Sequence, residues 1–373
     1  MISQELEKLA ADRAREAVQL DSQGLKSRAI ARYQEAIDLL LKLQSFCENP
    51  RIRQVYLDNA ERYQARIQQL REGRGEIVSQ EGERSGFEEL VLSEKPDVSW
   101  SDVANLQQAK IAINESIVYP FKRPDLYPLG WPRGILLFGP PGCGKTLLAA
   151  AVAAEISATF YYVDAASVMS KWLGESEKNI ARLFSSAREA CTRGNPSIIF
   201  IDELDSLAAV HRLEVGGESR ARTQILKEMD GLKEKGKSLH LYVLGATNKP
   251  WELDEPFVRR FQKRIHVPLP DASGRLEMFR LYTKDLTLTP SVNLERLASA
   301  AENYSGNDIH DLCMAIQIAV VREFFETQPS QAEGKPRPIT MEDFLQGMRN
   351  RGTSVSMENV KRIENWFTRY GAQ

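Results

Sequence analysis

The sequence of 373 residues has few cysteines, no long apolar run and almost no net charge. Its four cysteines lie far apart without a C-x-x-C pair, which argues against a zinc site and a disulfide framework. No apolar run approaches the ~18 residues of a membrane-spanning helix, and the N-terminus lacks a signal-peptide core. A net charge of −2 gives no global basic field. We therefore expect a cytoplasmic globular protein without direct nucleic-acid or membrane partners.

Patterns of apolar residues divide the chain into four parts. In residues 1–72, three apolar stripes at helical spacing predict an all-α three-helix bundle. Residues 73–96 are rich in Gly, Glu, Ser and Arg, which is typical of a flexible linker. Residues 97–270 alternate short β-branched runs with helices, the pattern of a parallel sheet covered by helices. Residues 271–373 carry helical signals only, which predicts a small helical domain.

Individual elements follow from the same patterns. The second stripe of the bundle is expected to face its interior with Ile30, Tyr33, Ile37, Leu40 and Leu41. The strands of the parallel sheet are expected at Ile135–Phe138, Phe160–Val163, Ile198–Ile201, Leu241–Leu244 and Arg264–Val267.

A glycine-rich segment between a predicted strand and a predicted helix, residues 139–146, matches G-x-x-x-x-G-K-[ST]. Its glycines let backbone N–H groups converge on phosphate oxygens, and the helix N-terminus adds a positive dipole. Lys145 is expected to reach the β and γ phosphates of ATP, and the Thr146 hydroxyl to hold Mg²⁺. A plain glycine-rich turn is the alternative. We expect the nucleotide to contact Pro141, Gly142, Cys143, Gly144, Lys145, Thr146 and Leu147.

Two further apolar strands end in polar side chains. Asp202 and Glu203 follow one, and Asn248 follows the next. Asp202 is predicted to bind the Mg²⁺ shell, and Glu203 to polarise the attacking water, because a carboxylate within hydrogen-bond reach can accept its proton. Asn248 can hold the same water and sense the γ-phosphate. Such residues are more often caps or turn formers. Here they follow the glycine-rich segment 139–146, which we call the P-loop, and this order favours catalytic roles.

A pair of arginines, Arg259 and Arg260, closes a short predicted helix. A surface ion pair is the plain alternative. An Arg finger supplied in trans contributes ~10³ to 10⁵ in rate in related enzymes. If these arginines complete a neighbour's site, the active species is an oligomer.

A candidate substrate-gripping loop follows the second strand. It carries Trp172 beside Lys171 and Gly174, which favours a loop tip over a core position. An exposed aromatic side chain can grip an extended peptide with little sequence demand.

These motifs together resemble the AAA family of ATPases from residue 98 onward. Residues 170–178 and 261–270, with a single ATPase cassette, look like the meiotic clade, which includes katanin, spastin, fidgetin and the vacuolar-protein-sorting ATPase that disassembles ESCRT-III. Ala29-Ile30, Tyr33 and Ala36-Ile37 are similar to the microtubule-interacting-and-trafficking (MIT) domain, whose three-helix bundle binds ESCRT-III subunits. The whole arrangement most resembles the archaeal cell-division type of the vacuolar-protein-sorting ATPase.

The resemblance implies an α/β P-loop module with a small helical lid, preceded by an MIT-like bundle and assembled as a hexamer. It implies that the adenine lies near Asp102, Val103 and Gly306. It also implies that the central pore is lined by Lys171, Trp172 and Leu173.

Two departures from the family pattern stand out. Residues 325–339 are too few for the β-domain inserted by the eukaryotic members, so activators that bind this β-domain are not expected. Residues 305–308 contain no Arg that could act as a second sensor of the nucleotide in addition to Asn248.

The function expected is an ATP-hydrolysing ring motor that threads ESCRT-III-like subunits through its pore, recruited to membrane-associated filaments in membrane scission or cell division. One alternative keeps the motor and makes the substrate a microtubule or another filament. A second is a nucleotide-switched assembly scaffold, against which Glu203 argues, because switching alone needs no water-activating carboxylate.

Overall fold

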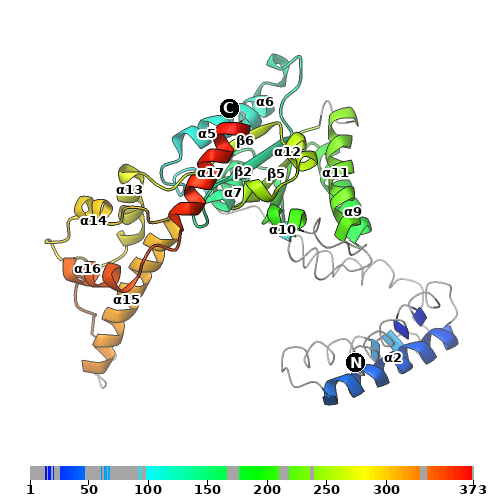
Figure 1. Cartoon of the computed structure of the whole chain (residues 1–373), viewed down its shortest axis with the longest axis horizontal. Helices are drawn as coiled ribbons and strands as arrows, with labels where there is room; N and C mark the ends of the chain where they lie inside the picture. The colour runs from blue at the N-terminus through cyan, green and yellow to red at the C-terminus, as the bar shows by residue number, and fades with distance from the viewer. Residues whose placement is uncertain are drawn as a thin grey trace. The chain divides into compact units, whose positions relative to one another are not determined.

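The protein forms two compact units in a computed structural model, Met1–Gly86 and Phe87–Gln373 (Figure 1). None of the helices in the described part of the chain combines the length and apolarity that crossing a bilayer requires. The structure describes residues 13–14, 16–17, 20, 26–46, 60, 63–64, 66–67, 92–93, 98–165, 176–209, 218–235, 239–327 and 334–371.

In the first unit, helix α2 (Lys26–Phe46) buries one face. Side chains at alternating spacings of four and three residues form this face: Ala29, Tyr33, Ala36, Leu40 and Leu43. The predicted interior position is wrong for Leu41, which is 43% exposed, because it lies outside this spacing. The buried face packs with Ala17, Ala60 and Ile67, and the ring of Tyr33 lies 5.6 Å from that of Tyr63.

Within the described residues, the sheet of the second unit has six strands, of which five run parallel and β1, at one edge, runs antiparallel to β3. The predicted parallel sheet is thereby confirmed, and the short edge strand is an addition. Strand β5 lies between β4 and β2, so the carboxyl ends of these three strands are neighbours. Across the sheet the order is β1 (Leu92–Ser93), β3 (Thr159–Asp164), β4 (Ser197–Asp202), β5 (Leu241–Thr247), β2 (Gly134–Phe138) and β6 (Lys263–His266).

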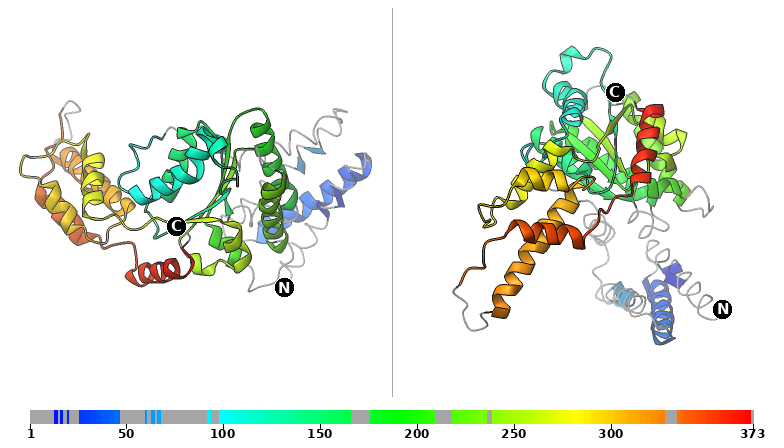
Figure 2. Two further views of the ribbon diagram at one scale, coloured as in Figure 1. Left: turned by 90° about the horizontal axis from the view of Figure 1, so that it is seen from above. Right: turned by 60° about the vertical axis from the view of Figure 1, so that its left-hand side comes forward.

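Helices cover both faces of the sheet (Figure 2). On one face Phe160, Ile198 and Phe200 pack against α7, whereas on the other Val163 and Ile201 pack against α9 and α11. Each strand thus alternates its side chains between two apolar clusters. The surrounding elements are α5 (Gln107–Ile113), η1 (Asn114–Val118), α6 (Tyr119–Lys122), η2 (Pro124–Leu126), α7 (Lys145–Glu155), α9 (Ser176–Thr192), α10 (Leu204–Ala209), α11 (Glu218–Lys235), η4 (Pro250–Glu252) and α12 (Glu255–Arg260).

The chain continues into helices with a separate apolar core that includes Phe279, Leu297, Leu312 and Phe344. This core explains why the sequence beyond residue 270 carries helical signals only, because each helix buries one stripe against the others. The helices are α13 (Ala272–Thr283), α14 (Leu294–Ala300), α15 (Gly306–Thr327) and α16 (Met341–Asn350). We call them the lid.

The last helix, α17 (Met357–Tyr370), returns to the sheet instead of joining the lid core. The ring of Trp366 lies 4.8 Å from that of Phe138, the last residue of β2. Arg362 stacks over Trp251 with its guanidinium carbon 4.1 Å from the ring centre. The C-terminal helix therefore buttresses the strand that leads into the glycine-rich segment.

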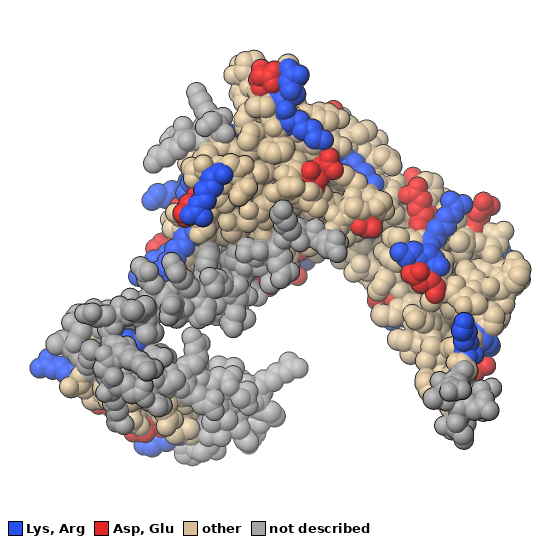
Figure 3. Space-filling view, turned by 180° about the vertical axis from the view of Figure 1, so that it is seen from behind, with Lys and Arg blue, Asp and Glu red and all other residues tan. Residues whose placement is uncertain are grey.

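Charged side chains of both signs lie close together on the face shown in Figure 3, in the part of it that the structure describes. Ion pairs join side chains of opposite sign in the second unit. Arg123 pairs with Asp125 at 2.6 Å, and Arg337 pairs with Asp343 at 2.7 Å and with Glu323 at 2.9 Å.

Candidate nucleotide site

The glycine-rich segment turns sharply between β2 and α7. Gly142 and Gly144 have φ angles of 71° and 88°, in the left-handed region that glycine adopts without a Cβ penalty. Helix α7 begins directly afterwards at Lys145, so its first N–H groups face the turn. Pro141 is exposed in the same turn and Leu147 is 36% exposed, while Cys143 is buried with a thiol pKa raised to about 12 by burial. This thiol therefore stays protonated.

Lys145 is buried with its ammonium inside the turn. The ammonium donates hydrogen bonds to the carbonyl oxygens of Gly139 at 3.0 Å and Pro140 at 2.9 Å, and to Oδ1 of Asn248 at 2.6 Å. All three acceptors are neutral, and burial lowers the pKa of Lys145 to about 8. Phosphate oxygens would be charged acceptors for the same ammonium, so the site is suited to an anion.

Thr146 and Asp202 supply hard oxygen donors at one point. The Thr146 hydroxyl donates to Oδ2 of Asp202 at 3.0 Å, although 56 residues separate them. Among the residues that the structure describes, no three His, Cys, Asp or Glu side chains form a metal site. Mg²⁺ usually takes one or two protein oxygens and completes its shell with phosphate and water. The pair therefore fits a nucleotide-bound Mg²⁺.

Glu203 is held in an unusual backbone conformation. Its φ is 50°, which is uncommon for a residue with a Cβ, and its N–H donates to Oδ1 of Asp202 at 2.9 Å. The side chain is exposed at the end of β4. Partial desolvation of the carboxyl group, followed by the negative charges of Asp164, Asp202 and Asp205, raises the pKa of Glu203. A raised pKa makes the carboxylate a better proton acceptor.

The lid meets the glycine-rich segment at the start of α15. The N–H of Asn307 donates to the carbonyl oxygen of Gly142 at 3.2 Å. A Cβ on Gly306 would lie 3.1 Å from the same oxygen, so the glycine permits the close approach. Ser305 and Asp308 cap this helix through hydrogen bonds of 2.8 and 2.9 Å from the Ser305 N–H and hydroxyl. Ser305 and Asp308 thus serve the cap, and residues 305–308 offer no Arg to the site.

Two of the three residues expected near adenine, Asp102 and Val103, differ in exposure. Val103 is buried, and its carbonyl oxygen accepts a hydrogen bond of 2.5 Å from the Lys110 ammonium. Asp102 is exposed, and its carboxylate accepts bonds from the N–H and hydroxyl of Ser99, which lower its pKa. The Val103 side chain therefore packs in the apolar core, while the Asp102 carboxylate is engaged in a local turn.

The two predicted arginine fingers have different surroundings. Arg259 is 72% exposed and pairs with the exposed Glu255 one turn earlier. The side chain of Arg260 is 26% exposed and bonds Asp230 of α11 at 2.7 Å. The carbonyl oxygen of Arg260 lies directly against Gly134, at the amino end of β2. The glycine-rich segment lies beyond the opposite end of this strand.

The remaining predicted residues, Lys171, Trp172 and Leu173, lie outside the described residues. Two carboxylates beside Glu203 were missed by the sequence reasoning. Asp164 ends β3, and Asp205 accepts a hydrogen bond of 2.7 Å from the Thr247 hydroxyl. Asp164 could have been found by the rule that identified Asp202, because it is also a carboxylate at the end of an apolar strand.

Comparisons with known proteins cover both units. The family "ATPase family associated with various cellular activities (AAA)" matches residues 135–269, and the "MIT (microtubule interacting and transport) domain" matches residues 8–72. The "Cell division protein C" of Sulfolobus acidocaldarius is 46% identical over 376 aligned residues, which cover 98% of each chain. A human protein of the katanin p60 ATPase type is 35% identical over 301 residues, which cover 77% of this chain and 60% of that protein.

Solved structures match about three quarters of the chain. The crystal structure of the FIGL-1 AAA domain in complex with ADP is 35% identical, has a TM-score of 0.69, and covers 78% of this chain and 98% of its own. A structure titled "Structural Basis for Katanin Self-Assembly" is 29% identical with a TM-score of 0.63, covering 76% and 95%. The predicted ATPase module and MIT region are both confirmed. The chain belongs to the AAA family of nucleotide-binding ATPases, with an MIT domain near its N-terminus.

Proposed function

We propose that this chain hydrolyses Mg²⁺-ATP as a ring, capturing its substrate through an N-terminal adapter and pulling it through a central pore. The observation that carries the proposal is the convergence of the P-loop with the ends of β4 and β5. Lys145 would bind the phosphates, and Thr146 with Asp202 would hold Mg²⁺. The metal would neutralise charge that develops on the phosphates.

Glu203 and Asn248 would position the attacking water. The raised pKa of Glu203 and its exposed position suit proton acceptance from water as the γ-phosphoryl group leaves. The amide oxygen of Asn248 accepts a hydrogen bond from the Lys145 ammonium, so Asn248 can link the phosphate-binding ammonium to the water. A nucleotide-switched scaffold would need neither residue, and hydrolysis is therefore the better supported function.

Arg259 would complete the site of a neighbouring protomer. Arg260 lies against Gly134, and the five residues of β2 span about 16 Å from there to the P-loop. This distance exceeds the reach of an Arg side chain. Arg259 is exposed, whereas Arg260 is tied to Asp230, so we assign the finger to Arg259 and a supporting role to Arg260.

The substrate we propose is an ESCRT-III-like filament protein, captured through the MIT region. The support is the match of residues 8–72 to the MIT domain and the similarity to a cell division protein over nearly the whole chain. The threading step rests on the predicted pore residues Lys171, Trp172 and Leu173. Recruitment by such filaments would bring a hexamer to the membrane indirectly. The similarity to katanin keeps another filament as the second candidate.

A mixing experiment with two variants tests the ring. Lys145→Ala protomers lack the phosphate ligand but keep Arg259, whereas Arg259→Ala protomers keep the P-loop but lack the finger. Each is expected to be inactive alone, and the mixture to recover ATPase activity. Arg193→Ala is the matched control, because Arg193 is 71% exposed and pairs with Glu189 one turn away, as Arg259 does with Glu255. No recovery in the mixture would refute a finger acting in trans.

The substrate is tested separately. The ATPase rate of the native protein is measured with and without a C-terminal peptide of an ESCRT-III protein. The particle mass is measured by light scattering with ATP, using Glu203→Gln to trap the assembly. Stimulated hydrolysis and a trapped hexamer support the filament-disassembly motor. Assembly without any response to the peptide, combined with stimulation by tubulin polymer, would instead favour the severing function.

A further inference from the structure

Strands β3 and β4 end side by side with a carboxylate on each. They are parallel and in register, with Thr159 opposite Ser197 and Asp164 opposite Asp202. Residues opposite each other on neighbouring parallel strands point to the same face, and the strands lie about 4.8 Å apart. The carboxyl group of Asp164 is therefore an immediate lateral neighbour of the Asp202 carboxylate.

The face that Asp164 shares is the one that carries the P-loop helix. Phe160 and Phe200 belong to the apolar cluster that includes Leu148 of α7, and alternate residues on each strand point to the same side. Continuing that alternation places Asp164 and Asp202 above the same helix. The hydrogen bond from Thr146 to Asp202 confirms this direction for Asp202.

An aromatic pair marks the same face of both strands. The Tyr162 ring lies 5.9 Å from that of Phe200, two residues before Asp164 and Asp202 on their strands. Phe200 belongs to the apolar cluster that includes Leu148 of α7, and Tyr162 packs against this cluster. Asp164 and Asp202, two residues further along, therefore follow onto that face.

The oxygens of Asp202 already have protein partners. Oδ2 accepts the bond from Thr146, and Oδ1 accepts the bond from the N–H of Glu203. A hydrated Mg²⁺ at this pair would keep several water molecules, whose hydrogens need acceptors. Carboxylates that accept from metal-bound water orient the shell and strengthen metal binding. Asp164 is positioned on the neighbouring strand to do this.

We propose that Asp164 is a positioning residue for Mg²⁺, a second carboxylate that holds the metal's water shell from the end of β3. The proposal rests on the proposed function, since it requires Mg²⁺ at Thr146 and Asp202. If Asp164 has this role, the affinity for the metal depends on a residue outside the P-loop and the end of β4. The affinity for the nucleotide alone does not require it.

The test measures metal affinity in the full chain carrying Glu203→Gln, which prevents turnover. Free Mn²⁺ is titrated by electron paramagnetic resonance in the presence of ATP, and ATP affinity is measured separately in chelator. Asp164→Asn is expected to weaken Mn²⁺ binding about tenfold. Its affinity for metal-free ATP should stay the same or increase, because a negative charge near the phosphates is removed.

Glu155→Gln is the matched control for the loss of a carboxylate. Glu155 lies on the same helix as Thr146, about 14 Å further along it, and pairs with Lys122. Its substitution should leave both affinities unchanged. Thermal unfolding without ligand checks the fold, and Asp164→Ser provides a second variant should Asp164→Asn unfold.

The outcomes separate the two hypotheses. Unchanged Mn²⁺ affinity in Asp164→Asn overturns the inference about Asp164 and leaves the proposed function standing. A parallel loss of metal and metal-free ATP binding also overturns it, because that pattern indicates a structural role. Failure of the Glu203→Gln parent to bind Mn²⁺ with ATP would instead remove the proposed function on which the inference depends.

Discussion

The ammonium of Lys145 donates a hydrogen bond to Oδ1 of Asn248 across 2.6 Å, joining residues 103 positions apart in the chain. Strand β5 carries Asn248 at its end and lies beside β2, which leads into the P-loop. One contact therefore connects the cation proposed to bind phosphate with the residue proposed to hold the attacking water. The pH dependence of binding and the rate of hydrolysis should both depend on it.

The pH dependence of ATP binding should reflect Lys145. Burial lowers its pKa to about 8, and the protonated ammonium is the form that attracts phosphate. ATP affinity is therefore expected to be constant below about pH 8 and to fall about tenfold per pH unit above it, until the pKa of the complex is reached. Fluorescence titration with a labelled ATP measures this. Lys145→Ala should bind weakly without a slope, and a flat native profile from about pH 7 to about pH 10 would contradict the prediction.

Removing the Asn248 amide should impair hydrolysis more than binding. Asn248→Ala is expected to lower the ATPase rate about 10²-fold, because one preorganised hydrogen-bonding group is lost from the proposed reacting centre. ATP affinity should change only a few-fold, since Lys145 keeps its charge. Lys249→Ala is the control, because the Lys249 side chain is 52% exposed and faces Glu252. Equal rate losses in both variants would show that the loop, and not the amide, is responsible.

The close approach of the lid to the P-loop should make Gly142 intolerant of a methyl group. A Cβ there would lie 2.8 Å from the Ser305 hydroxyl oxygen, and its φ of 71° is strained for any other residue. Gly142→Ala is expected to cost about 1 to 2 kcal/mol in backbone strain and to weaken nucleotide binding. Gly352→Ala has open space and should stay within about 0.5 kcal/mol of the native free energy of unfolding. Denaturant unfolding compares the two, and equal effects would disprove the clash.

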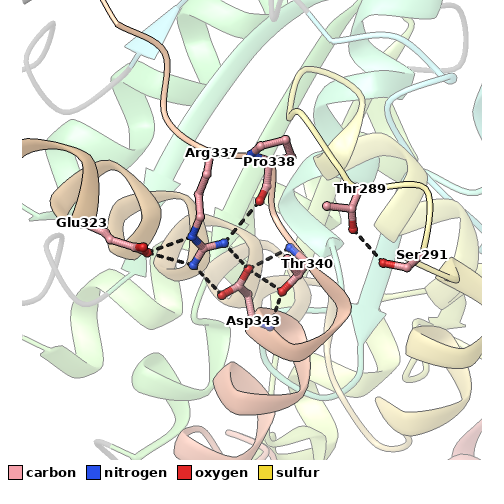
Figure 4. Close-up of polar contacts among 7 residues, drawn as sticks. All are labelled: Thr289, Ser291, Glu323, Arg337, Pro338, Thr340 and Asp343. Atoms are coloured by element: carbon pink, nitrogen blue, oxygen red, sulfur yellow. Dashed lines mark hydrogen bonds and ion pairs between the residues drawn. The ribbon is translucent and has the colours of Figure 1, made fainter. Parts of the chain in front are cut away.

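The lid should lose an anchoring contact in acid. The Arg337 guanidinium lowers the pKa of Asp343 to about 2, and Asp343 also accepts the N–H and hydroxyl of Thr340 (Figure 4). The folded pKa is depressed, so the stabilisation is complete above the ordinary value near 4 and is lost as the pH falls toward 2. Because Arg337 is partly exposed, we expect the stabilisation from this ion pair to be only about 1 kcal/mol.

Unfolding free energies of native and Asp343→Asn proteins measure this contribution. Their difference should be largest near neutral pH and vanish below about pH 2, where the Asp343 carboxyl is protonated in the folded protein as well. Asp285→Asn provides the control, because Asp285 is 87% exposed and lies 4.0 Å from Lys284. A difference between native and Asp343→Asn that persists in acid would show that the pair with Arg337 is not its source.

By itself the sequence determined which segments form strands and which form helices, and in what order. It also identified most of the side chains considered for the candidate nucleotide site. The alternation of strands with helices, the glycine spacing before Lys145 and the polar residues at strand ends are local patterns, because backbone geometry and apolar periodicity act over a few residues. They were sufficient for the parallel sheet, the lid helices and the P-loop. The interior position predicted for Leu41 is wrong, because the sequence alone allows the apolar stripe of α2 to pass through either of two neighbouring positions.

Only the tertiary structure decided which strand ends meet. The order β3, β4, β5, β2 places Asn248 between the P-loop and Asp202, and it depends on packing between segments far apart in the chain. The same packing ties Arg260 to Asp230 while Arg259 stays exposed, although the two are chemically identical neighbours. It also turns Asp164 to the face of α7. Such relationships arise from non-local burial, which local periodicity does not encode.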